Sequence, residues 1–153
     1  MPTGQTVDII DGIEVTCMDV AMPMVIARAS DFGLTGDETQ DALDNNNAFF
    51  EQMEKVRLAA AKKMGMGDCS TSVTPKFGIV APNDQINHLT VRYFMPWRTH
   101  PTLAVTGSQC VASCALTPDT VAYPLMTKSE SIPAHLVLHH PMGTMLSLIH
   151  ISE

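Results

Sequence analysis

Apolar and polar residues alternate along residues 12–28, which is the pattern of strands with one buried face. Apolar Ile13, Val15 and Cys17 are separated by polar residues, so one side of the segment is apolar. Met22-Pro23 interrupts this alternation before a second apolar run. Because proline cannot donate to a strand ladder, we expect a bend or bulge where these two strands join.

Residues 31–65 have the pattern of a helical region. A short helix is expected to start at 36–38, with Asp37 as its N-cap. A second helix is expected at about 47–64, started by the asparagines 45–47 and ended by Gly65. Its apolar residues recur every three or four positions, at Phe49, Met53, Val56 and Ala60.

A further helix, at about 107–116, is small or apolar on every side. A helix without a polar face is expected to be buried all round, inside a sheet that wraps it. Strands are expected at 76–81, 88–94, 120–122 and 136–138, with a turn at 140–143. These elements predict an α+β fold in which a curled mixed β-sheet surrounds the small-residue helix and the 47–64 helix is peripheral.

Composition narrows the class of protein. The chain has 153 residues, 45% of them hydrophobic, enough for one domain or one lobe of a larger enzyme. Its net charge of −7 arises entirely before residue 70, where the sequence has twelve acidic and five basic residues. We therefore expect no nucleic-acid partner, because no basic stripe remains. Without an apolar run of about 18 residues no membrane span is expected.

The cysteines indicate reduced thiols and a cytoplasmic location, because none of the four has the tight spacing of a disulfide framework. Cys17 and Cys69 have no neighbouring base that would make a nucleophile. Cys110 and Cys114, four apart on the small-residue helix, could share a metal with His100, His139 or His140. Their apolar neighbours favour a buried helix instead, and no metal is expected.

Arg98, His100 and the helix start at 106–108 form the better candidate site. The first amides of a helix have free donors and a partial positive charge, which suits a carboxylate. Hydroxyls of Thr106 and Ser108 would add donors, and Arg98 a charge-assisted pair. The alternative is that Thr106 or Ser108 only caps the helix and Arg98 faces solvent. The 140–143 segment could likewise be a plain turn.

Short segments in a fixed order extend this interpretation over residues 2–145. They are Pro2-Thr3-Gly4, 11–19, Met22-Pro23, Arg28-Ala29, Asp31-Phe32-Gly33, 56–65, Pro75-Lys76, Arg92-Tyr93-Phe94, Pro96, Arg98, His100, Val105-Thr106-Gly107, Pro118 and His140-Pro141. Together they resemble the second half of 4-oxalomesaconate tautomerases. That family includes the PrpF-like 2-methylaconitate isomerases and has the diaminopimelate epimerase fold.

Two positions separate the branches of this superfamily. Where epimerases and methylaconitate isomerases carry Asn-Pro, this chain has Met22-Pro23, which is similar to the oxalomesaconate branch. The position of the epimerases' acid–base cysteine is Ala104 here, so a two-cysteine racemase mechanism is not expected. Gln5 and Met142 depart from the family pattern, which weakens a substrate-binding role for those two turns.

The resemblance implies an enzyme of two lobes, each a curled sheet around a helix, with the active site between them. The reaction is a cofactor-free keto–enol proton shift in an unsaturated tricarboxylate, in gallate or protocatechuate degradation. The family's catalytic lysine and cysteine belong to the first lobe, so no catalytic residue is expected here. Residues 1–145 would be the C-terminal lobe, inactive alone, and 146–153 a non-native tail that resembles translated adapter; a genuine strand is the alternative.

The expected role of this lobe is to bind substrate, with the missing N-terminal lobe as its partner and a homodimer left open. His100 could also assist proton transfer. Two other functions stay open, a 2-methylaconitate-type cis–trans isomerase and a non-catalytic carboxylate-binding lobe. The expected substrate-binding residues are Thr3, Gly4, Met22, Arg98, His100, Thr106, Gly107 and Ser108.

Overall fold

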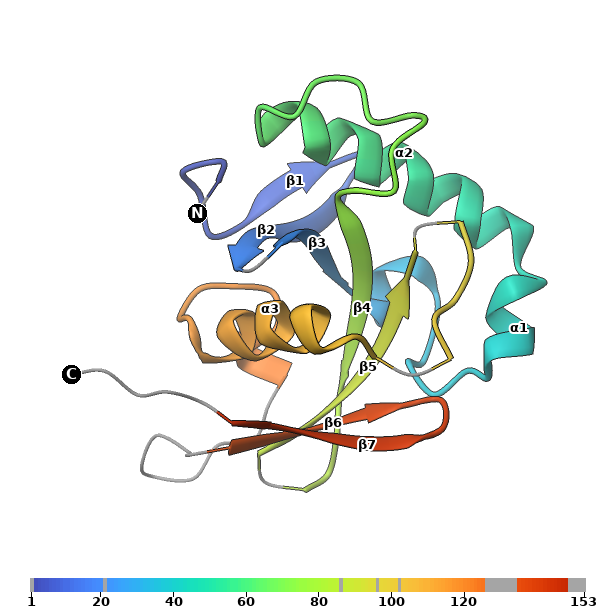
Figure 1. Ribbon diagram of the computed structural model, residues 1–153, viewed down its shortest axis with the longest axis vertical. Helices are drawn as coiled ribbons and strands as arrows, with labels where there is room; N and C mark the ends of the chain where they lie inside the picture. The colour runs from blue at the N-terminus through green and yellow to red at the C-terminus, as the bar shows by residue number, and fades with distance from the viewer. Residues whose placement is uncertain are drawn as a thin grey trace.

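One seven-stranded mixed sheet organises the chain (Figure 1). The computed structural model describes residues 2–20, 22–85, 87–95, 97–101, 103–125 and 135–148. Within these residues the spatial order of the strands follows the sequence. The strands are β1 (Asp8–Ile10), β2 (Ile13–Val20), β3 (Met22–Arg28), β4 (Lys76–Pro82), β5 (His88–Phe94), β6 (His135–His140) and β7 (Gly143–Leu148).

Two parallel pairings divide the otherwise antiparallel sheet, and each requires a crossover. β3 pairs in parallel with β4, and the crossover between them carries the helices that cover one face. β5 pairs in parallel with β6 through a second crossover. The first holds η1 (Ala29–Phe32), α1 (Gln40–Asp44) and α2 (Asn47–Lys63), and the second holds α3 (Val105–Leu116) and η2 (Tyr123–Leu125).

Alternation along the strands creates one hydrophobic core on each face of the sheet. In β3, Met24 and Ile26 belong to the core that contains the α3 residues. The intervening Val25 and Ala27 belong to the core beneath α2. All four side chains are fully buried, so β3 has no solvent-facing side in this segment.

The predicted central helix is confirmed. Cys110, Val111, Cys114 and Ala115 of α3 are all fully buried. The helix contacts β2, β3 and β7, which lie toward opposite edges of the sheet. A sheet that reaches one helix from both edges must curl, and Figure 1 shows α3 between the β1–β3 strands and the β6–β7 hairpin. The α+β fold with a curled mixed sheet is therefore confirmed.

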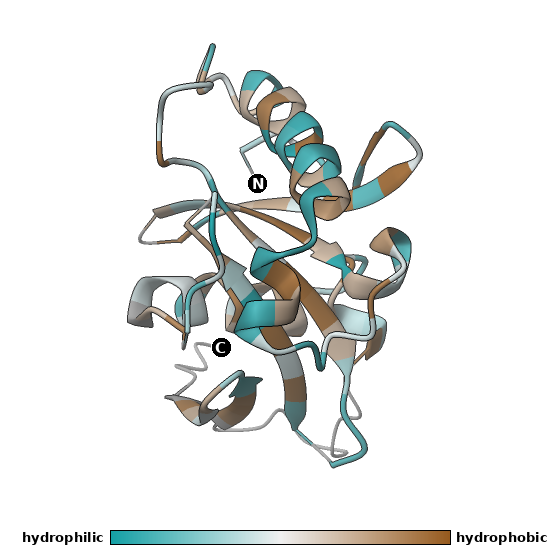
Figure 2. Cartoon of the chain, turned by 90° about the vertical axis from the view of Figure 1, so that its right-hand side faces the viewer, coloured by the Kyte–Doolittle hydropathy of each residue, from teal (hydrophilic) through white to brown (hydrophobic). Residues whose placement is uncertain are grey.

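The peripheral helix α2 also follows the sequence pattern. The Asn46 side chain accepts a hydrogen bond from the amide of Phe49 at 3.1 Å, as an N-cap does. Gly65, just beyond the helix, has a φ of +80°, the left-handed conformation that glycine tolerates. Hydrophobic and hydrophilic residues mark different sides of this uppermost helix in Figure 2. The predicted apolar stripe is buried, at Phe49, Met53, Val56 and Ala60.

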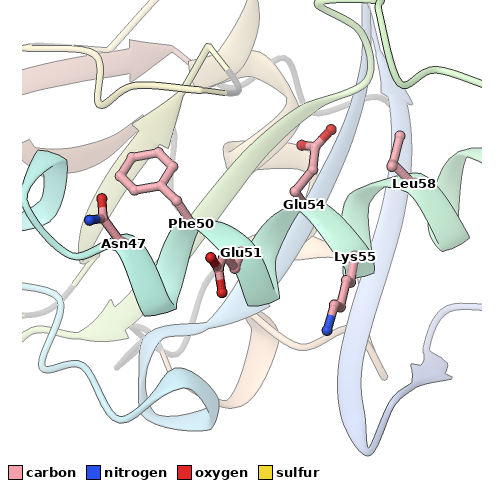
Figure 3. Close-up of a pocket in the computed structure, with 6 residues that line it drawn as sticks. All are labelled: Asn47, Phe50, Glu51, Glu54, Lys55 and Leu58. Atoms are coloured by element: carbon pink, nitrogen blue, oxygen red, sulfur yellow. The ribbon is translucent and has the colours of Figure 1, made fainter.

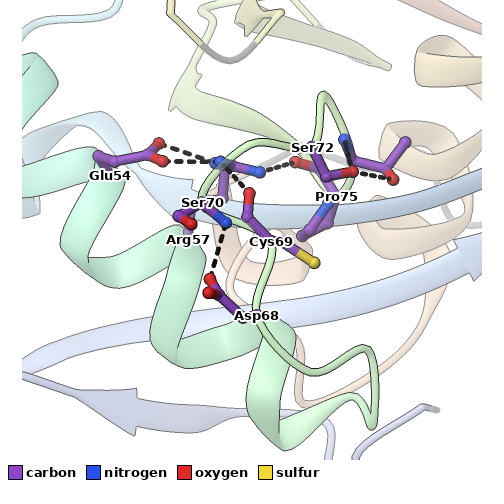
Figure 4. A network of polar contacts seen from close by, with 8 residues as sticks. Glu54, Arg57, Asp68, Cys69, Ser70, Ser72 and Pro75 are labelled. Carbon is purple, nitrogen blue, oxygen red and sulfur yellow. Dashed lines mark hydrogen bonds and ion pairs between the residues drawn. The ribbon is translucent and has the colours of Figure 1, made fainter.

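Arg57 is a charged residue inside that otherwise apolar face, and its side chain is fully buried. Its guanidinium makes a two-point ion pair with Glu54, at 2.7 and 2.8 Å. It also donates to the carbonyl oxygens of Cys69 and Pro75, at 3.1 and 3.3 Å (Figure 4). The Trp97 ring lies 5.9 Å from the guanidinium carbon. This cation therefore ties the loop after α2 to the helix.

The short helix begins later than predicted, and Asp37 is not its N-cap. Thr39 caps α1 by accepting a hydrogen bond from the amide of Ala42 at 3.1 Å. The carboxylate of Glu38 accepts from the amides of Thr35 and Gly36, each at 2.8 Å. These bonds stabilise a turn before the helix and lower the pKa of Glu38 despite its partial burial. The helix therefore starts after that turn.

The prediction of a strand at 120–122 was wrong, because this segment forms bends and no strand. The hydroxyl of Thr120 donates to the carbonyls of Cys114 and Thr117, at 2.6 and 2.9 Å, so it satisfies the C-terminal end of α3. Val121 donates its amide to the Thr16 hydroxyl at 3.0 Å rather than to a strand. These bonds hold the segment in turns that lead into η2.

Other boundaries refine the prediction. The chain reverses between Val20 and Met22, which are paired, and Pro23 lies in the ladder opposite Asp19. The 140–143 segment is a turn between strands, as predicted, and β7 then pairs with β6 as far as Leu148. Residues 149–153 of the predicted tail lie outside the described residues. In the described part of the chain, no helix combines the length and apolar character that crossing a membrane requires.

Candidate functional site

The start of α3 packs against the middle of the sheet at Gly107. A Cβ at this position would lie 3.0 Å from Cε2 of Tyr93, so glycine permits the close approach. The N-cap residue is Ala104, and no side chain of the described residues caps the helix there. The alternative that Thr106 or Ser108 serves as the N-cap is therefore excluded. Ser108 instead donates its amide to the Ala104 carbonyl at 2.8 Å as part of the first turn.

Met22 meets two hydroxyl groups at this helix start. The hydroxyl of Thr106 donates to the Met22 sulfur at 3.1 Å, and that of Tyr93 lies 3.7 Å from the same sulfur. Thr106 is exposed and Met22 is half-buried. A thioether is a weak acceptor, so an anion arriving at the Thr106 hydroxyl would offer it a stronger partner. The beginnings of β3 and α3 are thereby brought together, as the predicted site requires.

His100 joins this group through Tyr93. The two ring centroids lie 5.5 Å apart, and the His100 amide donates to the Tyr93 carbonyl at 2.7 Å. Arg98 lies two residues earlier in the same loop and is exposed. Its carbonyl accepts from the amide of Met95 at 3.0 Å. Arg98 and His100 thus lie in a short loop after β5, and backbone hydrogen bonds hold this loop against the end of the strand.

Tyr93 and Cys110 were not among the predicted site residues, although both contact the group. Burial raises the pKa of Tyr93 to about 12, so its hydroxyl is neutral and can donate. Burial also raises the pKa of Cys110. The Cys110 thiol donates to the carbonyls of Val20 and Met22, at 3.0 and 3.2 Å. A lone tyrosine in an apolar strand and a cysteine among small residues gave no sequence signal beyond core packing.

Thr3 and Gly4 have different surroundings. The Thr3 hydroxyl donates to the Asp8 carboxylate at 2.5 Å. Gly4 is exposed in the same turn, with a φ of +79°. These bonds tie the turn to β1. The contacts around the α3 start join Met22, His100, Thr106 and Gly107, and they do not include this N-terminal turn.

The thiols are buried rather than grouped for metal binding. All four cysteines are free and buried. Burial raises the pKa of Cys17 to about 12 and that of Cys114 to about 11. Among the residues whose positions are described, no three His, Cys, Asp or Glu side chains lie together as metal ligands would.

Two surface hollows share none of the residues of the α3 start. One lies along the outer side of α2 (Figure 3), and its lining is mixed, with Phe50 and Leu58 beside Glu51, Glu54 and Lys55. The other lies between the sheet and η2, where Arg28 forms an ion pair with Glu14 at 2.6 Å.

Comparison with known proteins identifies the class. The chain is 35% identical over 153 residues to (4E)-oxalomesaconate Delta-isomerase of Novosphingobium sp. (strain KA1), covering 100% of this chain and 43% of that protein. It is 34% identical over 143 residues to 4-oxalomesaconate tautomerase of Pseudomonas putida, covering 94% of this chain and 40% of that protein. One relative is named an isomerase and the other a tautomerase, and the chain spans less than half of the length of each.

The fold agrees with this class. A crystal structure of methylitaconate-delta-isomerase superposes with a TM-score of 0.90, covering all of this chain and 45% of that one at 24% identity. The PrpF protein family model matches residues 1–152. The chain belongs to the PrpF family.

Proposed function

We propose that this chain is the C-terminal, substrate-binding lobe of a two-lobe isomerase. The whole enzyme would move a proton between the keto and enol forms of an unsaturated tricarboxylate such as 4-oxalomesaconate, without a cofactor. Residues 1–145 would form the lobe. Of the predicted tail, residues 146–148 belong to β7 and pair with β6, and residues 149–153 would be additional to the lobe. The observation that carries the proposal is the packing of Tyr93 between His100 and the α3 start, where no side chain of the described residues caps the helix. Arg98 lies two residues before His100 and is exposed.

The reaction requires three things of its active site. A base must remove a proton from carbon, an acid must return one elsewhere, and fixed donors must hold the developing enolate and the carboxylates. The last requirement suits the residues here. The Thr106 hydroxyl, the Gly107 amide and the Arg98 guanidinium can all donate to a carboxylate. The Ser108 amide, which was predicted to join them, already donates to the Ala104 carbonyl. Base and acid would come from the other lobe, so the isolated chain would be inactive.

Identity favours the oxalomesaconate substrate class. The two oxalomesaconate relatives are 35% and 34% identical to this chain, against 28% for the 3-methylitaconate isomerase of Eubacterium barkeri and 26% for the 2-methyl-aconitate isomerase of Shewanella oneidensis. Met22 supports the same choice. The proposal also places the whole enzyme in the degradation of aromatic acids. It includes a cytoplasmic location, with which four free cysteines agree because thiols stay reduced there.

Titration of the ¹⁵N-labelled 153-residue chain with trans-aconitate, a stable unsaturated tricarboxylate, tests the binding role. The proposal predicts amide shift changes at residues 98–108. Arg98→Ala should weaken the apparent affinity about tenfold, because one charge-assisted hydrogen bond is lost at an exposed position. Lys62→Ala, which removes the same charge from the far end of α2, is the matched control.

Two results would refute the binding role. One is a well-dispersed spectrum that trans-aconitate leaves unchanged around the α3 start. The other is an equal loss of affinity in Arg98→Ala and Lys62→Ala, since the effect would then reflect net charge alone.

A further inference from the structure

The loop that carries Arg98 and His100 is fixed through its backbone. Phe94 and Thr99 form an isolated antiparallel bridge. On either side of Thr99, the Arg98 carbonyl accepts from the Met95 amide and the His100 amide donates to the Tyr93 carbonyl. The two site residues therefore flank one residue, Thr99, and any shift of its backbone moves both.

Two side chains of α1 bind the backbone of Thr99, although they lie 55 and 59 residues away in sequence. The Asp44 carboxylate accepts from the Thr99 amide at 2.7 Å. The Gln40 side-chain amide donates to the Thr99 carbonyl at 3.3 Å. Thr99 itself is fully buried, and its hydroxyl has no hydrogen-bond partner among the described residues. The α1 contacts are therefore with the backbone and not with the threonine side chain.

α1 is itself anchored independently of these two bonds. Leu43 is fully buried in the core beneath α2. Arg92 of β5 donates from Nε to the Glu38 carbonyl at 2.8 Å, just before the helix. Thr39 caps the helix. A helix held in this way can fix the loop without depending on it.

We propose that Asp44 and Gln40 are positioning residues for Arg98 and His100, with Asp44 the stronger of the two. This rests on the proposed substrate-binding role of that pair. A charge-assisted bond to a backbone amide is shorter and stronger than a neutral one, and the two distances agree with this order. Loss of Asp44 would let the Thr99 backbone shift, and the loop would present its cation and imidazole less often in the binding geometry.

The experiment compares three single variants of the 153-residue chain. Asp44→Ala removes the acceptor, Asp44→Asn keeps an oxygen that can accept from the Thr99 amide, and Asp41→Ala removes an equal charge from the same helix. Two quantities are measured, the hydrogen-exchange rate of the His100 amide and the affinity for trans-aconitate. The His100 amide reports on the loop because its acceptor, Tyr93, is not the mutated residue.

Asp44→Ala is expected to speed His100 exchange about tenfold and to weaken trans-aconitate binding about three- to tenfold. Asp44→Asn should keep the His100 exchange rate and the trans-aconitate affinity close to their wild-type values. Asp41→Ala should match the wild type in both quantities. Unchanged exchange and affinity in Asp44→Ala would overturn the inference, and so would a defect in Asp44→Asn as large as in Asp44→Ala.

Failure of the proposed function would look different. The wild type would then not bind trans-aconitate, yet the exchange rate of His100 would still decide whether Asp44 fixes the loop. Equal His100 exchange in Asp44→Ala and the wild type would overturn the positioning role in that case too.

Discussion

The hydroxyl of Thr106 donates to the sulfur of Met22 over 3.1 Å, which joins the first turn of α3 to the first residue of β3. This contact places a weak acceptor where the proposed substrate would offer a strong one. The hydroxyl is thereby oriented before substrate arrives. Binding would then exchange a thioether for a carboxylate at the same donor.

Substitutions at these two residues should differ in effect. Thr106→Val keeps the shape and removes the donor, so trans-aconitate affinity should fall about three- to tenfold. Met22→Leu removes only the weak acceptor, and affinity should stay within about twofold. Titration of both variants by NMR measures this. A larger loss in Met22→Leu than in Thr106→Val would show that the sulfur, and not the hydroxyl, matters for binding.

Arg57→Ala should destabilise the fold strongly. It leaves Glu54 without its partner and the Cys69 and Pro75 carbonyls without their donor, and breaking a buried ion pair typically costs about 3–5 kcal/mol. Urea unfolding followed by circular dichroism measures the free energy of unfolding. Lys55→Ala, an exposed position on the same helix, should stay within about 0.5 kcal/mol. Equal values for the two variants would contradict the structural role of Arg57.

Two glycines with left-handed backbones provide a matched pair. Gly36 and Gly67 have φ of +92° and +73°, but only at Gly36 would a Cβ approach another atom closely, 2.5 Å from the Cβ of Ala81. Gly67→Ala should cost about 1 kcal/mol from backbone strain. Gly36→Ala should cost about 1–3 kcal/mol more, because it overpacks against β4. Thermal unfolding of the two variants under one condition tests this order, and the reverse order would contradict it.

Stability should fall as the pH rises above about 9. Burial raises the pKa of Cys17 to about 12 from 9.0, and those of Cys114 and Tyr93 to about 11 and 12. Above pH 9 the unfolded chain releases the two thiol protons, and above pH 10 it releases the Tyr93 proton, while the folded chain keeps all three. The folded state then binds more protons, so the free energy of unfolding decreases with pH, by at most about 1.4 kcal/mol per unit for each group.

Urea midpoints between pH 8 and 11 measure this slope. Cys17→Ala should be less stable at pH 8, because it leaves a cavity, yet less sensitive to pH. An unchanged slope in Cys17→Ala would contradict a buried, neutral thiol at that position.

Short-range pattern was sufficient for much of the fold. Helical periodicity and an asparagine start predicted α2, and small residues on every side predicted that α3 is buried. The strand β1 was missed although a signal exists. Asp11-Gly12, both with positive φ, forms the two-residue loop between the paired Ile10 and Ile13, and Asp-Gly is a favoured pair for such a hairpin.

Contacts between distant residues could not be predicted in this way. Thr120 has a strand-like apolar neighbourhood, but its hydroxyl binds the end of α3, which a local pattern cannot show. Asp44 and Thr99 meet only because β5 and the α1 crossover lie together. The placement of Tyr93 beneath Gly107 likewise depends on how α3 crosses the sheet.

A chimera tests the central claim most directly. In it this chain replaces the matching 43% of the Novosphingobium (4E)-oxalomesaconate Delta-isomerase, and the spectral change of oxalomesaconate is followed. We expect the chimera to isomerise the substrate and Arg98→Ala to reduce kcat/KM about tenfold or more. A chimera that folds as cooperatively as its parent but does not convert oxalomesaconate would contradict the claim that this chain is the substrate-binding lobe of such an isomerase.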